Sequence, residues 1–117
     1  MRRSVLVTLL LIIALSTVTT SGQVTARGRI TMLRVHDAGT GFGPSSDFID
    51  VEVVISLDSQ PGKFFGFQLR NDAKLPARRG MLDLLRDAYE RNLIVSTDYF
   101  PVPGKNNSIL FRVWLSK

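Results

Sequence analysis

Residues 76–99, PARRGMLDLLRDAYERNLIVSTDY, decide the fold of this chain. In the first part of the stretch the apolar residues recur at intervals of three and four, which places them on one face of a helix; they are Ala77, Met81, Leu84, Leu85 and Ala88. Pro76 suits the first helical turn because its missing N–H would have no partner there, and Asn92 tolerates the left-handed conformation that ends helices. The stretch therefore predicts one helix that leads directly into a strand.

The N-terminal segment has the order of a secretory signal peptide. Arg2 and Arg3 precede an apolar run over residues 5–15, and small polar residues follow as far as Gly22. The apolar run is shorter than the roughly 20 residues that a membrane-spanning helix needs. We therefore expect residues 1–22 to be a signal peptide, with cleavage after Gly22 or Ala26. The protein is then secreted or periplasmic, without integral membrane association.

Residues 23–117 have the length of one domain. Without the leader, the chain has thirteen Lys and Arg and ten Asp and Glu, which gives a net charge of +3. Such a charge favours polyanions moderately, but it is also an ordinary route to solubility, which is the interpretation we prefer. The chain has no cysteine, so both a lipid anchor on cysteine and a disulfide framework are excluded.

The segments before the helix read as strands and turns. Residues 29–36 predict a strand whose apolar phase changes between Met32 and Leu33, as in a bulged strand shared by two sheets. Residues 37–47 contain three glycines and a proline and predict a long loop. Residues 48–58 alternate, and predict a half-buried strand, with Ile49, Val51, Val53, Ile55 and Leu57 inward and Asp50, Glu52, Ser56 and Asp58 outward.

A hairpin and two further strands complete the pattern. Pro61 and Gly62 occupy the centre of a type II turn that returns the chain as a strand over residues 64–70. Gly66 marks a point in that strand where another backbone could approach closely or the strand could bend. Residues 93–100 predict a fourth strand and residues 101–107 a turn. Residues 108–117 predict the fifth strand, with Ile109, Phe111, Val113 and Leu115 facing inward.

This order of elements predicts an all-β fold with one helix. Three strands, a helix and two strands (β-β-β-α-β-β) is the order of a five-stranded OB-fold Greek-key barrel, in which the helix covers one end. A ferredoxin-like arrangement requires a second helix, for which the sequence has no candidate. We therefore expect an OB-fold domain over residues 23–117.

The helix-to-strand segment carries a resemblance to a known family. The residues MLDLLRDAY leading into NLIVSTDY, in a secreted domain of this length, resemble the small secreted bacterial OB-fold proteins that include the B subunit of subtilase cytotoxin. The resemblance implies a glycan-binding module that forms rings, with a pentamer as the toxin-like form. It assigns no individual binding residue.

The residue types that carry catalysis are sparse, and we expect neither an enzyme nor a cofactor. His36 is the only histidine, and it has no companion motif for zinc or for a Ser–His–Asp triad. The glycine-rich residues 39–43 resemble a phosphate loop but do not lead into a helix. Asp37, Asp47 and Asp50 lack the spacing of an EF-hand calcium loop, so we interpret them as solvated acids.

The predicted ligand site lies on two loops. In an OB-fold the loops at 37–47 and 101–107 lie on the same side as the usual ligand face. The candidate ligand-binding residues are Thr40, Phe42, Ser45, Ser46, Lys105, Asn106 and Asn107. We expect a glycan or another anionic ligand. The alternative is a periplasmic oligonucleotide or polyanion binder, against which the acids predicted on the outer face of residues 48–58 argue.

A second set of residues is predicted to face away from the core. Strand phase places Val54, Phe64, Leu110, Arg112 and Trp114 outside. Exposed apolar side chains that cluster mark interfaces, so these residues are candidates for a homo-oligomer contact or for stacking on a ligand. Burial beneath the helix or a terminus is the equal alternative.

Overall fold

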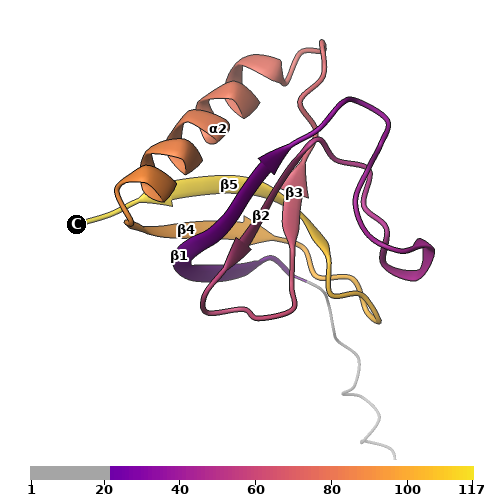
Figure 1. Cartoon of the computed structure of the whole chain (residues 1–117), viewed down its shortest axis with the longest axis horizontal. Helices are drawn as coiled ribbons and strands as arrows, with labels where there is room; N and C mark the ends of the chain where they lie inside the picture. Colours follow the sequence, from indigo (N-terminus) through magenta and orange to yellow (C-terminus); the bar gives the residue numbers. More distant parts are fainter. Residues whose placement is uncertain (1–21) are drawn as a thin grey trace, which may run out of the picture.

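The computed structural model describes residues 22–117, so residues 1–21 of the predicted signal peptide lie outside the described residues. The fold is mostly β with one long helix, and its five strands form a sheet that closes into a ring (Figure 1). The strands are β1 (Val24–Val35), β2 (Val53–Leu57), β3 (Phe65–Phe67), β4 (Ile94–Tyr99) and β5 (Ser108–Leu115). The helix α2 spans Leu75–Glu90, and a short 3₁₀ helix η1 spans Ser45–Asp47.

The ring is closed by β1, which pairs with two different neighbours. Its first half lies antiparallel to β4, from Val24 opposite Tyr99 to Arg29 opposite Ile94. Its second half lies antiparallel to β2, and the register shifts between Ile30 and Met32. The predicted bulged strand shared between two sheets is therefore confirmed. The strand begins five residues earlier than predicted, because residues 24–28 also pair with β4.

The hairpin of β2 and β3 also agrees with the prediction. Its strands are antiparallel, the Lys63 amide donates to the Gln60 carbonyl at 3.1 Å, and Gly62 has a φ of 81°. A Cβ on Gly66 would lie 2.6 Å from the Val53 carbonyl oxygen. The close backbone approach predicted at this glycine is therefore confirmed. Next to it, β3 runs parallel to β5 and completes the order β1-β2-β3-β5-β4.

The helix begins and ends where the sequence predicts. Pro76 lies in its first turn, and Asn92 has a φ of 54° just after its end. The Leu93 amide donates to the Ala88 carbonyl at 2.9 Å, which satisfies an end carbonyl that would otherwise lack a partner. Leu85 and Ala88 are buried against the sheet, whereas Ala77 is exposed. The apolar face of the helix therefore packs on the core from its second turn onward.

The main core fills the space between the sheet and α2. Its buried members come from every strand and from the helix: Ala26, Ile30, Val53, Ile55, Leu57, Phe65, Phe67, Leu85, Ala88, Val95, Tyr99, Leu110 and Val113. No helix among residues 22–117 is long and apolar enough to cross a membrane.

A second, smaller core lies beneath the loop that connects β1 and β2. Ile49, Val51 and Val54 are buried there, and Met32, Phe42 and Phe64 pack against them. The loop segment thus covers a face of the sheet that the alternation of residues along the strands predicts to be exposed to solvent. Ile49 and Val51, predicted to share a face with Val53, belong to this second core instead, because regular strand structure starts only at Val53.

The inward face of β5 also differs from the prediction. The register between β4 and β5 shifts at Asp98 and Tyr99, so that Tyr99 lies opposite Leu110 while Asp98 lies opposite Arg112. Phe111 is the extra residue at this irregularity and has no partner opposite it in β4. Because of this extra residue, the side chains of β5 before Phe111 point to the faces opposite to those that regular alternation predicts. Leu110 is therefore buried, whereas Ile109 and Phe111 are exposed.

Candidate functional site

Two loops are joined at one end of the molecule by the side chain of Asp47. Its carboxylate accepts hydrogen bonds from the backbone amides of Asn106 (3.1 Å) and Asn107 (2.9 Å). In return, Asn107 Nδ2 donates to the Asp47 carbonyl at 2.7 Å. The segments 37–47 and 101–107, which are far apart in the sequence, therefore form one connected surface at the end of the sheet away from the C-terminus (Figure 1).

Lys105 and Gly43 hold this loop pair further in place. Lys105 Nζ donates to the Phe48 carbonyl at 3.1 Å. Gly43 has a φ of 98°, and a Cβ there would lie 2.6 Å from the Asp47 carbonyl oxygen and 2.7 Å from Asn107 Nδ2. Only glycine fits this conformation and this space without strain. The two loops are thus held together by hydrogen bonds within the chain, without a ligand.

A groove of about 350 Å³ lies beside the joined loops. Phe48, Ile49, Val102 and Ile109 give it an apolar lining, and its polar lining comes from Asp50, Gln68, Lys105, Asn107 and Ser108. Phe48 is 40% exposed, and its ring lies against Gly41. The groove therefore combines an exposed aromatic ring with an amide, a carboxylate and an ammonium group, the mixture of apolar lining and few polar groups usual in small-molecule sites.

An ion-pair network between Arg70, Asp50 and the buried Glu52 fixes the polar wall of this groove. Arg70 contacts Glu52 through two nitrogens, at 3.0 Å and 2.8 Å, and Asp50 at 2.6 Å. Gln68 Nε2 donates to the Asp50 carbonyl at 3.1 Å. These bonds hold Asp50 and Gln68 in fixed positions on the strand side of the groove.

Glu52 is 2% exposed, so its predicted place on the solvent face is wrong. Arg70 and the Leu69 amide surround its carboxylate. The hydrogen bond from Arg70 lowers the pKa of Glu52 below its ordinary value, although burial opposes that change. The carboxylate of Glu52, which was expected on the outer face, is instead paired with Arg70 inside the protein.

The structure brings part of the predicted ligand site together. Lys105 and Asn107 line the groove, and Ser45, Ser46 and Asn106 lie in the joined loops next to it. Thr40 is engaged elsewhere in the first loop: it shares a hydrogen bond with His36 Nδ1 and donates to the Asp37 carbonyl, both at 2.9 Å. Phe42 is half-buried and packs on Phe64, with ring centroids 4.9 Å apart.

Seven groove residues are absent from the prediction: Phe48, Ile49, Asp50, Gln68, Val102, Ser108 and Ile109. For two of them, the sequence contains a feature that could have indicated a place in the ligand site. Val102 is an apolar residue inside a turn, and Phe48 is an aromatic residue directly after a loop. Ile109 had none, because the irregularity in β5 that turns it outward depends on pairing with β4.

Of the predicted outward-facing set, Leu110 faces the main core instead, whereas Val54 and Phe64 do face away from the main core but are covered. Val54 and Leu110 are buried, and Phe64 packs against the second core. Val54 and Phe64 are covered by the loop before β2, and Leu110 turns inward at the β5 irregularity. Trp114 is half-buried and pairs across the strands with Ser96, while Arg112 contacts Asp98 at 2.6 Å. Self-association stays a prediction. Of the five predicted interface residues, only Arg112 and Trp114 are still candidates for a contact between subunits.

Comparison of the chain with protein-family models, with curated proteins and with solved structures finds no match. The function is therefore argued from the geometry of the site.

Proposed function

We propose that this protein is a non-catalytic OB-fold binding module whose ligand is a glycan held in the groove beside the joined loops. The strand order β1-β2-β3-β5-β4 and the position of the helix between β3 and β4 support the OB-fold assignment. In that fold the loops after β1 and before β5 bind oligosaccharides or oligonucleotides. The groove beside those two loops is the single observation on which the proposal rests.

The lining of the groove favours a sugar. A pyranose ring has an apolar face of C–H groups and a rim of hydroxyls, so it needs an apolar or aromatic surface beside hydrogen-bonding groups. Phe48 supplies an exposed ring, and Asp50 and Gln68 supply acceptors and donors. The groove contains one carboxylate and one ammonium group among its lining residues, a balance that favours a neutral, hydroxyl-rich ligand over a polyanion.

The rigidity of the loops supports binding without a large ordering cost. The bonds from Asp47 to the second loop are made within the chain itself. A preformed groove loses less conformational entropy on binding than a mobile one. This matters for a shallow site, because a single sugar offers few contacts.

The experiment is a glycan array followed by titration of the best-bound sugar. Phe48→Ala removes the exposed ring and should weaken binding about tenfold, as loss of a central aromatic contact does. Phe100→Ala is the matched control, because Phe100 is also an exposed aromatic residue but does not line the groove.

Two results would contradict the proposal. One is that F48A and F100A weaken sugar binding equally. The other is that no glycan binds, while a fluorescent single-stranded oligonucleotide binds and F48A weakens that binding. The second result would support the oligonucleotide alternative for the same groove.

A further inference from the structure

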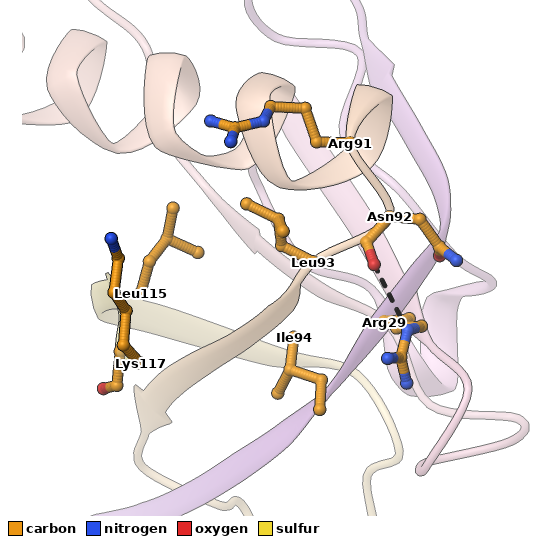
Figure 2. Close-up of a pocket in the computed structure, with 8 residues that line it drawn as sticks. Arg29, Arg91, Asn92, Leu93, Ile94, Leu115 and Lys117 are labelled. Carbon is orange, nitrogen blue, oxygen red and sulfur yellow. Dashed lines mark hydrogen bonds between the residues drawn. The ribbon is translucent and has the colours of Figure 1, made fainter.

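A second groove lies at the opposite end of the molecule, between the end of α2, the middle of β1, the start of β4 and the end of β5. It has a volume of about 470 Å³, within the range of small-molecule sites. Figure 2 shows its lining, which comprises Arg29, Arg91, Asn92, Leu93, Ile94, Leu115, Ser116 and Lys117. It shares no residue with the groove beside the loops.

The charged side chains that line this groove are all cationic. They belong to Arg29, Arg91 and Lys117, and no lining residue has an acidic side chain. None of the three forms a salt bridge within residues 22–117. Arg29 is nonetheless held in place, because its Nε donates to the Asn92 carbonyl at 3.2 Å, the bond drawn in Figure 2. The groove therefore offers positive charge that the described part of the chain leaves unpaired.

The floor of the same groove is apolar. Leu93 and Leu115 pack against the main core, and Ile94 is 39% exposed. Two of them lie on paired strands, with Ile94 opposite Arg29 and Leu115 opposite Val95. Backbone pairing therefore holds Ile94 and Leu115 of the floor and Arg29 of the rim in place relative to one another.

We propose that this groove binds a small amphipathic anion, a molecule with one carboxylate, sulfonate or phosphate head and an apolar body. The head would lie at Arg29 and Arg91, where the positive charge is unpaired, and the body would cover Leu93, Ile94 and Leu115. Asn92 and Ser116 are the only neutral polar residues that line the groove, so its floor lacks the hydrogen-bonding groups that a sugar would need. This site is independent of the glycan proposal and has a different ligand chemistry.

A matched pair of fluorescent probes tests the proposal on the purified protein. The anion 8-anilinonaphthalene-1-sulfonate and the neutral N-phenyl-1-naphthylamine share the same aromatic body and differ in the sulfonate. We expect saturable binding of one sulfonate probe per chain, with the neutral probe at least about fivefold weaker, which corresponds to one partly exposed ionic contact. Decanoate should displace the bound probe, and decanol should not.

Variants locate the probe in the groove. Arg91→Glu should weaken sulfonate binding at least about fivefold, and Ile94→Ser should weaken both probes. The controls are Arg79→Glu, which makes the same charge change on the exposed part of α2, and Val35→Ser, which removes an exposed apolar side chain elsewhere.

The proposal is overturned by any of three results. The first is equal affinity for the two probes. The second is an equal loss of sulfonate binding in R79E and R91E, which would indicate an effect of net charge alone. The third is the absence of saturable binding by the parent protein.

Discussion

Glu52 is the residue that joins the first strands to the segment before the helix. Its carboxylate accepts bonds from the Leu69 amide and from Arg70, and its own backbone carbonyl accepts a bond from the His36 amide at 2.8 Å. Removing one partner of a buried ion pair costs more than the pair contributes, because the remaining charge stays buried. Glu52 is therefore a structural residue, although its alternation with apolar neighbours is typical of a solvent-facing position.

The pH dependence of stability tests this assignment. The pKa of Glu52 is lower in the folded protein than the ordinary value of 4.5, so the carboxylate contributes stability above pH 4.5. That contribution is lost as the pH falls through the folded pKa. We expect Glu52→Gln to lower the free energy of unfolding at neutral pH by about 2 kcal/mol and to flatten its fall below pH 4.5.

Urea unfolding at a series of pH values measures both effects. Asp83→Asn is the control, because Asp83 forms only an exposed pair with Arg86 on the surface of α2. Identical pH dependence in E52Q and the parent protein would contradict the role assigned to Glu52.

At the scale of elements, α2 is held by its packed face rather than by its intrinsic propensity. Gly80 lies inside it and costs roughly 1 kcal/mol relative to alanine. Leu85 is fully buried between the helix and the sheet, at 0% exposure. The energy that keeps the helix in place therefore comes from a few buried side chains in its second half.

Leu85→Asp should unfold the domain, because it places an unpaired charge in the main core at a cost of several kcal/mol. Circular dichroism and thermal melting measure the effect. Ala77→Asp makes a similar change at an exposed position in the first turn, where a negative charge is favourable, and should leave the melting temperature nearly unchanged. If L85D melts like the parent protein, the assignment of this face to the core is wrong.

At the scale of the whole molecule, the ring closes only if β1 keeps its first half. Residues 24–29 supply all six register pairs to β4, and Thr97 Oγ1 donates to the carbonyl of the buried residue Ala26. A chain that began at Arg27 would lose the first three of these pairs. Of the two predicted cleavage points, the one after Gly22 therefore leaves the fold intact.

We accordingly predict that export removes residues 1–22 and that the mature chain begins at Gln23. Intact-mass measurement of protein from the native host distinguishes this start from one at Arg27. A mature species that begins at Arg27 and melts cooperatively would show that the first half of β1 is dispensable for the ring.

The sequence by itself determined the type and order of the elements. The helix over 75–90, its proline start and its left-handed end at Asn92, the hairpin turn at Pro61 and Gly62, and the bulged first strand all follow from local chemistry. These features depend on backbone preferences and on periodicity within a few residues. Such local features can be predicted from the sequence of one chain without knowledge of its tertiary contacts.

Only the tertiary structure decided which apolar side chains are exposed and where the grooves lie. Val54 is covered by a loop that passes over its sheet face, and Ile109 is turned outward by an irregularity that exists only when β5 pairs with β4. The candidate glycan groove likewise needs Asp47 to reach Asn107, sixty residues along the chain. Alternation along one strand carries no information about contacts between distant segments, because those depend on how the whole sheet closes.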